Sequence, residues 1–482
     1  MSMPIITTVS LAVVALISLA IITSNKSKIP LSNPPDRFHT AFSRQVEFIT
    51  HGLEVVENAR KRYGKQPYRL ITNVGEMLVL PPSYAQTIRN EKSLHFGTTF
   101  AHVRYTDLLC EQCHAYSGDF TSKPLSDETS FALDVVFGDS SEWKETNITN
   151  DILNVVSRLS SKIFLGDKLC RNENWIRLST EYVVTAVKST KSFLAWPRYL
   201  HFMIPWVSKD AKLVIRQLDG IRAILRPILE ERELMKAEAR KMGTPVRVFE
   251  DMLEWLQEES QGAAYDPAAY QMLLTVAAIH TTSDLLSQVI MRLGNEPHLI
   301  DDLRAEIVSV LGAEGFSKAS IANLKLMDKA LKETQRMKPL QMQKKIVLSD
   351  GLTINKGDRL AVDAHAMLDP EVYPNPDKFD VYRYLRMRED GSNSTKALFV
   401  TTSPENLTFG HGIHACPGRF FAALEVKIAL CHILTKYDWE LLPGSNLEPF
   451  VQTGDQTCLD PRNMVRFRRR KEEIDFDSLS YK

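Results

Sequence analysis

The chain has 482 residues, enough to bury a large core, and its 59 Lys and Arg residues balance 59 Asp and Glu residues, so the formal net charge is zero. This balance provides no overall field that would attract the protein to nucleic acid or to acidic lipid. The six cysteines are too few for a disulfide scaffold in so long a chain, which indicates a reducing compartment and thiols available for other chemistry.

The first predicted element is a transmembrane anchor, residues 1–24. The first 25 residues carry no charged side chain, and residues 4–23 are apolar enough to cross roughly 30 Å of hydrocarbon as a helix. A cleaved signal peptide is the alternative, but no Lys or Arg precedes the apolar run and no clear small-x-small cleavage site ends it. Lys26 and Lys28 follow directly, so the positive-inside rule predicts that the remaining chain faces the cytosol.

A proline-containing connector, residues 25–40, separates the anchor from one large domain, residues 41–471, which a tail of residues 472–482 follows. No internal repeat or long flexible linker interrupts the domain, so a single folded unit is predicted. Three Asn-x-Ser/Thr tripeptides would remain unglycosylated in the cytosol, and they begin at Asn147, Asn393 and Asn406.

The domain is predicted to be mainly α with small β-sheets. Apolar residues recur at three- and four-residue spacing over five long helical segments, residues 152–164, 174–193, 209–239, 267–293 and 298–311. The pieces rich in β-formers are shorter, residues 69–80, 345–354 and 464–467. The basic run 466–471 is followed at once by acidic residues, so we interpret it as a solvated terminal strand and not as a nucleic-acid patch.

A Cys-x-x-Cys-His sequence spans Cys110 to His114, with its second thiol at Cys113, and has the form of a covalent c-type haem attachment motif. That motif would imply an exported electron carrier, which conflicts with the predicted cytosolic orientation. A zinc site is disfavoured because no second pair of ligands lies nearby. We therefore interpret the match as fortuitous.

The apolar segment 193–206 contains three large aromatic residues, Trp196, Phe202 and Trp206. It has two interpretations, a lipid-facing entrance to a binding site or core packing between two helices. The sequence does not choose between them.

The predicted helix over residues 272–285 contains Ala-Ala-Ile-His-Thr-Thr, residues 277–282. The two alanines would leave room beside the helix for a ligand, and the Thr281 hydroxyl could relay protons. His280 has an unperturbed pKa near 6.5, and Asp284 follows one turn later on the same face. Taken alone, the segment is best interpreted as an ordinary buried helix.

Two charged residues, Glu333 and Arg336, are three positions apart on one predicted helix face, where a carboxylate and a guanidinium can pair. Taken alone, such a pair is common and usually contributes less than about 1 kcal/mol at a protein surface.

Residues 409–420 place a thiol in a turn punctuated by glycines, ahead of a predicted helix at 420–434. Cys416 precedes the helix amino terminus, where the helix dipole and free N–H groups stabilise the thiolate form that binds metals. The glycines carry no Cβ and let the backbone approach a flat ligand closely, and they are Gly410, Gly412 and Gly418. A buried free cysteine in a loop is the alternative.

This loop resembles the cytochrome P-450 pattern Phe-x-x-Gly-x-x-x-Cys-x-Gly at Phe409, Gly412, Cys416 and Gly418. Four such positions arise by chance roughly once in a thousand chains of this length. The resemblance extends over essentially the whole chain, anchor included. It implies the P-450 fold, with haem b (iron protoporphyrin IX) buried between the 272–285 helix and the loop.

The resemblance also implies roles for individual residues of the loop. Cys416 would be the axial ligand of the haem iron, and its thiolate would favour cleavage of the O–O bond. Phe409 would shield the sulfur, His414 would contact a haem propionate, and Gly418 would also belong to the haem-binding residues.

The other motifs acquire roles from the same resemblance. Thr281 aligns with the oxygen-activation threonine of the family, but His280 occupies a position where Asp or Glu is usual, so His280 is predicted to deliver protons, with Asp284 as the alternative. Glu333 and Arg336 would form a structural Glu-Arg-Arg cluster with Arg383, which lies in the family-like segment 374–384.

Trp143 and Lys144 resemble the family's propionate-contacting helix, although Asn147 stands where an arginine is usual. The resemblance therefore predicts that these two side chains contact the haem.

The implied reaction is hydroxylation of a lipophilic small molecule by dioxygen. No dinucleotide fingerprint or flavin domain is visible, so the electrons must come from another protein. The resemblance implies NADPH–cytochrome P-450 reductase as the donor, with cytochrome b5 as a further partner. It also implies a single-pass location in the endoplasmic reticulum membrane with the catalytic domain facing the cytosol.

The residues 277–282 and 414–422 are similar to those of fungal secondary-metabolism oxygenases that act on terpenoids and indole-diterpenes. A terpenoid or diterpenoid intermediate is therefore the expected substrate. Two alternatives remain: a polyketide or fatty-acid hydroxylase, and a non-oxygenase haem-thiolate isomerase or dehydratase. The intact Thr281 disfavours the second.

Overall fold

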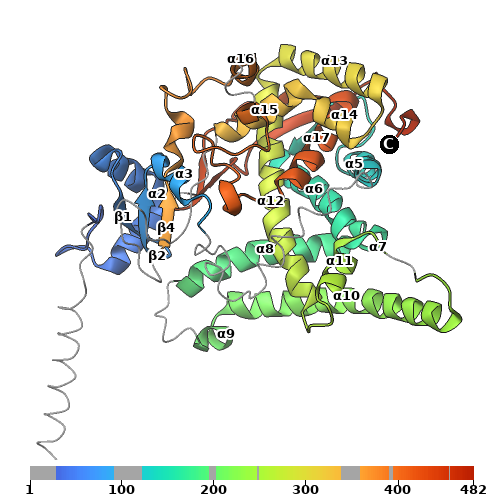
Figure 1. The fold of residues 1–482 in the computed structure, drawn as a ribbon, viewed down its shortest axis with the longest axis horizontal. Helices are drawn as coiled ribbons and strands as arrows, with labels where there is room; N and C mark the ends of the chain where they lie inside the picture. Colours follow the sequence, from blue (N-terminus) through green and yellow to red (C-terminus); the bar gives the residue numbers. More distant parts are fainter. Residues whose placement is uncertain are drawn as a thin grey trace, which may run out of the picture.

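The computed structural model of the chain describes residues 29–91, 122–194, 202–246, 249–337, 359–389, 395–454 and 456–481. The predicted anchor, residues 1–24, lies outside the described residues, as do Cys110, Cys113 and the β-rich piece 345–354. Within the described residues the fold is mainly helical with small sheets, as the sequence predicted (Figure 1).

A three-stranded sheet lies beside α2 at one end of the molecule (Figure 1). Its strand order is β1-β2-β4, with β1 antiparallel to β2 and β2 parallel to β4. The elements of this region are α2 (Ala41–Tyr63), β1 (Tyr68–Thr72), β2 (Gly75–Leu80), η1 (Pro82–Tyr84), α3 (Ala85–Ile88) and β4 (Arg359–Val362). The β-rich piece predicted at 69–80 is confirmed as the hairpin β1–β2, whereas its parallel partner comes from far along the chain.

The helical body surrounds the long helix α12. Its elements are α5 (Ser122–Val136), α6 (Ile148–Leu165), α7 (Asp167–Cys170), α8 (Glu173–Leu194), α9 (Ile204–Val207), α10 (Lys209–Met242), α11 (Met252–Glu259), α12 (Pro267–Gly294), α13 (Pro297–Glu314), α14 (Lys318–Asn323), α15 (Lys325–Arg336), α16 (Arg383–Glu389) and α17 (Arg419–Lys436). All five long helices predicted from apolar periodicity are present, as α6, α8, α10, α12 and α13.

Local capping explains where these helices begin and end. Ser208 accepts a hydrogen bond from the Ala211 amide at the start of α10, and Gly243 ends that helix with φ of +66°. At the start of α12, Asp266 caps the Ala268 amide and Pro267 occupies the first turn, where its missing N–H has no cost.

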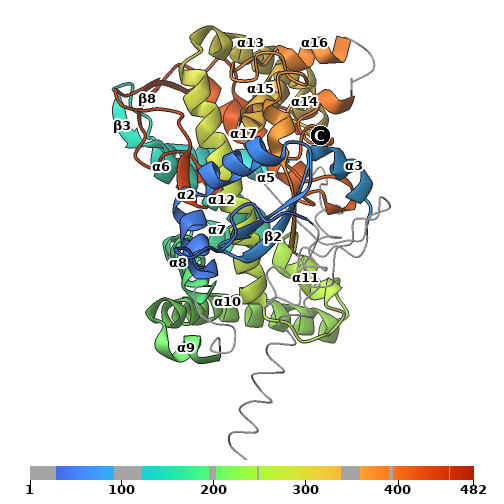
Figure 2. The same ribbon diagram turned by 90° about the vertical axis from the view of Figure 1, so that its left-hand side faces the viewer.

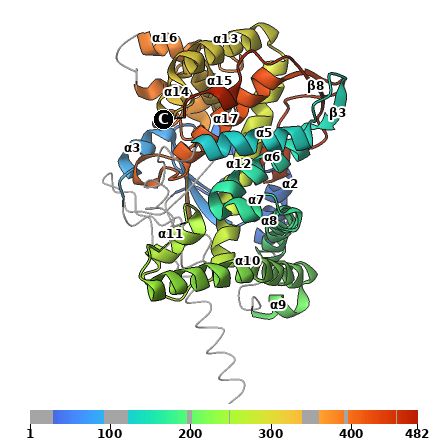
Figure 3. The same ribbon diagram turned by 90° about the vertical axis from the view of Figure 1, so that its right-hand side faces the viewer.

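The core is built around α12, which runs through the middle of the molecule in Figure 1 and is crossed by α5 and α6 in Figure 3. Its C-terminal half is the more deeply buried, with Leu286, Val289, Ile290 and Leu293 excluded from solvent. Among the described helices, α12 alone is long and apolar enough to cross a membrane, and most of its apolar stretch is buried inside the domain. We therefore assign it to the protein core.

Two small sheets lie towards the C-terminus, and Figure 2 shows β3 and β8 side by side. One has the order β3-β8-β5 and the other is the hairpin β6–β7. The strands are β3 (Lys144–Asn147), β5 (Tyr437–Leu441), β6 (Phe450–Thr453), β7 (Gln456–Cys458) and β8 (Met464–Arg469). The predicted terminal strand is confirmed as β8, and its basic side chains pair with carboxylates, as in Arg466 with Glu440 and Arg469 with Asp134.

Candidate functional site

The Cys416 loop is held by its own backbone. The Cys416 amide donates to the Phe409 carbonyl at 2.6 Å, and the Ala415 amide donates to the Gly412 carbonyl at 3.1 Å. A short 3-10 turn, η7 (Gly412–His414), lies between them, and α17 begins three residues after the cysteine. The Cys416 side chain is exposed. A thiol presented next to a helix amino terminus is set up for metal ligation as the thiolate.

At two positions of this loop the backbone conformation and the close contacts of the chain permit only glycine. Gly412 has a φ of +65°, and a Cβ there would lie 2.1 Å from the Arg89 carbonyl oxygen. The next amide, that of Ile413, donates to the same carbonyl at 2.9 Å. Gly410 has a φ of +73°, and a Cβ there would lie 2.8 Å from the His414 carbonyl oxygen. These glycines therefore fix the loop against α3 and against itself.

The third glycine, Gly418, lies next to the Cys416 sulfur, and its expected role in haem binding stays a prediction. Its backbone has no positive φ, and a Cβ at this position would lie 4.0 Å from the Cys416 sulfur, at ordinary contact distance. A hydrogen here in place of a methyl group leaves the space beside the thiol open for a flat ligand.

Phe409 and His414 also lie in the loop. The Phe409 ring packs edge-on against Phe399 with centroids 5.4 Å apart, while its carbonyl holds the Cys416 amide. The His414 Nε2 lies 2.9 Å from the Glu91 carbonyl oxygen, so this nitrogen must carry the proton in order to donate. His414 thus ties the loop to the end of the α3 region, and the predicted propionate contact stays a prediction.

One face of α12 is left uncovered by the described chain. Ala277 and Thr281 are exposed in the middle of a largely buried helix, and their four-residue spacing places them on the same side. The Thr281 hydroxyl donates to the Ala277 carbonyl at 2.8 Å. Because α12 packs against α17, the helix that follows Cys416, the uncovered face and the exposed thiol belong to neighbouring elements. The Cys416 thiol would supply the ligand to the iron, and the exposed side of α12 at Ala277 and Thr281 would supply an open surface for the haem.

His280, beside Thr281, has a buried Nε2 without a hydrogen-bond partner among the described residues. Burial lowers the pKa of this imidazole below its ordinary value of 6.5, so it is neutral at pH 7. Asp284, the alternative proton donor, is engaged elsewhere: one carboxylate oxygen accepts from the Leu459 amide at 2.8 Å and the other from the Gln288 amide group at 2.9 Å. The geometry therefore favours His280 over Asp284.

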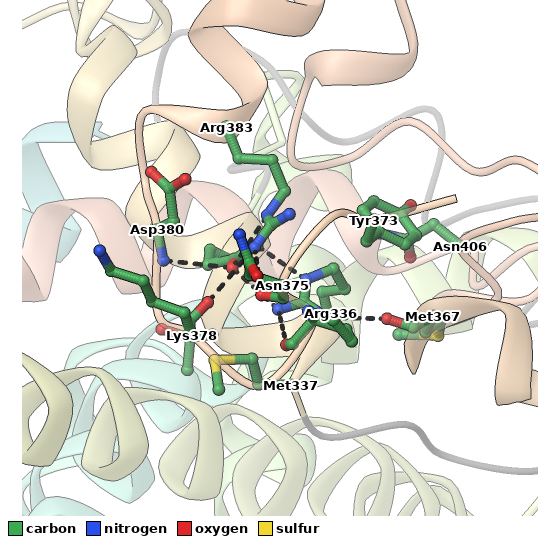
Figure 4. A network of polar contacts seen from close by, with 12 residues as sticks. Arg336, Met337, Met367, Tyr373, Asn375, Lys378, Asp380, Arg383 and Asn406 are labelled. Carbon is green, nitrogen blue, oxygen red and sulfur yellow. Dashed lines mark hydrogen bonds and ion pairs between the residues drawn. The ribbon is translucent and has the colours of Figure 1, made fainter. Parts of the chain in front are cut away.

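The predicted Glu-Arg-Arg residues meet in a fully buried cluster (Figure 4). Glu333 lies on α15 and pairs with Arg336 through two contacts, of 2.8 and 2.9 Å. Arg383, at the start of α16, reaches the same carboxylate at 3.3 Å, and the Asp380 amide donates to it at 3.2 Å. Burial in the absence of these partners would cost several kcal/mol per charge.

The two guanidinium groups of the cluster also donate hydrogen bonds to backbone carbonyls (Figure 4). Arg336 donates to Met367 at 2.8 Å and to Pro376 at 2.6 Å, and Arg383 donates to Asn375 at 3.0 Å. The cluster therefore clamps the irregular segment 367–378 onto α15, which is a structural role.

A second buried network on α15 was not predicted. Lys332 donates to the Leu398 and Thr401 carbonyls at 2.6 and 3.0 Å, and Lys329 donates to the Ala397 carbonyl at 2.8 Å. Asp328 accepts from the Phe399 amide at 2.9 Å. Burial lowers the pKa of Lys332 to about 7. This network fixes the segment that leads to Phe409. The only sequence signal for the network is the high density of charged residues on the short helix α15.

The sequence resemblance placed Trp143 and Lys144 on a helix, and this part of the prediction is wrong. Lys144 begins strand β3, which pairs with β8, and Trp143 precedes that strand. The Trp143 ring lies 4.8 and 4.5 Å from the guanidinium carbons of Arg466 and Arg468, and the Lys144 ammonium donates to the Val136 carbonyl at 2.7 Å. Strand pairing with a distant segment overrides the expected helix, whereas the haem contact expected of these two side chains stays a prediction.

Comparison with known proteins is consistent with this geometry. The family model described as cytochrome P-450 matches residues 123–467. The chain is 37% identical to the cytochrome P-450 monooxygenase hepE of Aspergillus oryzae over 471 residues, which cover 92% of this chain and 86% of that protein. It is 35% identical to the cytochrome P-450 monooxygenase adrA of Penicillium rubens over 501 residues, covering 97% of each.

A third relative, the cytochrome P-450 monooxygenase TRI1 of Fusarium sporotrichioides, is 36% identical over 473 residues, covering 92% of this chain and 86% of that protein. A solved structure, the retinoic acid-bound cyanobacterial CYP120A1, superposes with a TM-score of 0.63 at 17% identity, covering 92% of this chain and 100% of the other. At that identity the match establishes the fold alone.

Proposed function

The chain belongs to the cytochrome P-450 family and is a haem-thiolate monooxygenase, and we propose that it hydroxylates a terpenoid or diterpenoid intermediate of secondary metabolism at the endoplasmic reticulum membrane. The observation that supports the chemistry is the exposed Cys416 thiol in its glycine-shaped loop before α17. When bound, haem supplies an iron that activates dioxygen, so that one oxygen atom enters a C–H bond and the other leaves as water.

The residues present fit this group. Cys416 would ligate the iron, Gly418 leaves room beside the sulfur, and the exposed side of α12 at Ala277 and Thr281 offers the opposing surface. Phe409, packed against Phe399 next to the thiol backbone, would limit the access of water to the sulfur. Exclusion of water lowers the local dielectric constant and would strengthen the attraction between the thiolate and the iron.

Side chains of α12 would deliver protons to the reaction site. The Thr281 hydroxyl can release its bond to the Ala277 carbonyl and donate instead into the open space beside the helix. His280, neutral at pH 7 because burial lowers its pKa, can accept a proton at Nε2, which has no partner within the described part of the chain, and pass it on. This histidine would replace the carboxylic acid that is usual at the position.

A monooxygenase of this family takes its electrons from a redox partner and acts on a small molecule. We propose NADPH–cytochrome P-450 reductase as the donor and cytochrome b5 as a second one. The proposed anchor, residues 1–24, would hold the enzyme at the membrane in which both partners and lipophilic substrates concentrate.

The test uses full-length protein in microsomes that contain the reductase, with wild type compared with Cys416→Ala. We expect the reduced, carbon monoxide-treated wild type to show the red-shifted Soret band of thiolate ligation, and the variant to lose it. Wild type should convert a member of a diterpene panel to a product one oxygen heavier, only with NADPH. Turnover of fatty acids or polyketides alone would refute the substrate class, and turnover without NADPH would indicate an isomerase or dehydratase.

A further inference from the structure

A short segment of the chain, residues 397–401, lies just before the Cys416 loop and is held by buried charged side chains of α15. The Lys332 side chain is buried, and its ammonium group donates to the Leu398 carbonyl at 2.6 Å and to the Thr401 carbonyl at 3.0 Å. An ammonium group has three N–H donors, so one lysine can hold two carbonyls at once. The segment therefore has its backbone fixed by hydrogen bonds that come from a single buried side chain.

A buried carboxylate on α15 joins the same segment to the helix that follows the cysteine. Asp328 accepts a hydrogen bond from the Phe399 amide at 2.9 Å. Its two oxygens also lie 2.9 and 2.8 Å from the ammonium groups of Lys329 and Lys427. Lys427 belongs to α17, which begins three residues after Cys416 (Figure 1). One helix, α15, is thus connected to the chain on both sides of the Cys416 loop.

The chain from this segment onwards contacts the Cys416 loop at two points. The Phe399 ring packs edge-on against Phe409 with centroids 5.4 Å apart, and the Phe409 carbonyl accepts a hydrogen bond from the Cys416 amide at 2.6 Å. Directly after the segment, the Thr402 hydroxyl oxygen lies 3.1 Å from the His411 Nδ1. A displacement of the segment would therefore be transmitted to the backbone of the loop through a ring contact and through a hydrogen bond.

The choice of lysine at a buried position has a physical consequence. A buried ammonium group loses the hydration that it has in water, so an apolar side chain would occupy the position at a lower cost in desolvation. The charged group adds direction, because each N–H bond must point at a carbonyl oxygen, whereas apolar contacts have no preferred direction. Hydrogen bonds of this kind are suited to holding a ligand-bearing backbone to within about 0.5 Å of its working position.

We propose that Lys332 is a positioning residue for the Cys416 thiolate, an inference that rests on Cys416 being the haem ligand of the proposed function. It acts through the segment 397–401 and sets the direction in which the loop presents the sulfur. Because the groups that orient a ligand also tune the metal that it binds, a shift of the loop would weaken ligation by the thiolate. The Glu-Arg-Arg cluster on the same helix holds a different segment, residues 367–378, so the two roles can be separated by mutation.

The test compares the full-length haem proteins of wild type and Lys332→Met, purified in detergent. Methionine keeps an unbranched side chain of similar length but cannot donate to the two carbonyls. We expect the variant to show a several-fold larger fraction of the reduced, carbon monoxide-treated protein with the blue-shifted Soret band of lost thiolate ligation. We also expect a higher reduction potential of the iron, because a thiolate that donates less electron density stabilises the oxidised iron less. Each protein is measured well below its own melting temperature, which circular dichroism provides.

Two further variants separate positioning from stability. Thr334→Val is the matched control, because the Thr334 hydroxyl is also buried on α15 but donates to the Ala330 carbonyl within its own helix. This variant should keep the wild-type band and potential even where its melting temperature falls. Thr402→Val removes the contact with His411 at a half-buried position, and it should change the spectrum in the same direction as Lys332→Met by a smaller factor. It decides the question if Lys332→Met does not fold.

The possible outcomes distinguish this inference from the proposed function. A wild-type band and potential in folded Lys332→Met would overturn the inference and leave the proposed function standing, and so would an unchanged Thr402→Val where Lys332→Met does not fold. An equal spectral change in Thr334→Val would also overturn it, since loss of stability would then account for the effect. Retention of the thiolate band by Cys416→Ala would instead overturn the proposed function, and this inference with it.

Discussion

Glu425 provides the sharpest test of the buried electrostatics behind the thiol loop. It lies two turns into α17, is excluded from solvent, and accepts a hydrogen bond from the Ser160 hydroxyl on α6 at 2.7 Å. Its other oxygen has no partner among the described residues. Burial raises the pKa of this carboxyl from 4.5 to about 8. The folded protein therefore holds the proton in a pH range where the unfolded chain has released it.

The sign of the effect on stability follows from this shift. The stabilisation by the bound proton is complete below pH 4.5, is lost as the pH rises towards 8, and changes no further above 8. At about 1.4 kcal/mol per pH unit, the total loss in free energy of unfolding is of the order of 5 kcal/mol. A chain of this length has an unfolding entropy of about 1 kcal/mol/K. Dividing the free energy lost between about pH 5.5 and pH 8.5 by this entropy gives a fall in melting temperature of roughly 3 °C.

The assay compares wild type with Glu425→Gln, which keeps the acceptor for Ser160 but cannot ionise. We expect the melting temperature of the variant, relative to wild type, to increase by roughly 3 °C from about pH 5.5 to pH 8.5 in thermal unfolding of the full-length haem protein followed by circular dichroism. Glu54→Gln, at an exposed position on α2, is the control and should show no such trend. A difference between Glu425→Gln and wild type that does not change with pH would refute the reasoning.

Three further predictions concern the site. Glu333→Gln leaves two buried guanidinium groups without their counter-ion, and urea unfolding should show a loss of about 3–5 kcal/mol. Thr281→Ala removes the hydroxyl from the open face of α12; the carbon monoxide spectrum should persist while product formed per NADPH oxidised falls several-fold, and unchanged coupling would argue against the proton relay. Gly412→Ala forces a Cβ to within 2.1 Å of a carbonyl oxygen at positive φ, so haem incorporation should fail, whereas Gly444→Ala, with positive φ but open space, should retain the spectrum.

Much of the helical framework was predictable because its causes are local. Apolar residues at helical spacing, with Pro267 in the first turn of α12 and Gly243 after α10, define long helices without reference to the rest of the chain. The Cys416 loop is equally local, since its glycines, its cysteine and the helix after it are contiguous in the sequence. The sequence alone therefore determined the mainly helical class and the position of the thiol, and the resemblance of the loop to the cytochrome P-450 pattern implied the cofactor.

Other features depend on partners that are distant in the sequence. Lys144 joins a strand because β8 pairs with it from more than 300 residues away in the sequence, and Gly412 is required by the Arg89 carbonyl, which is equally distant along the chain. Lys329 and Lys332 are charged residue types that would be expected in solvent. They are buried because the backbone carbonyls at 397–401 accept hydrogen bonds from their ammonium groups. Only the tertiary structure decides such cases, because strand pairing and the burial of charge depend on whether a partner is present, and the chain supplies that partner through folding.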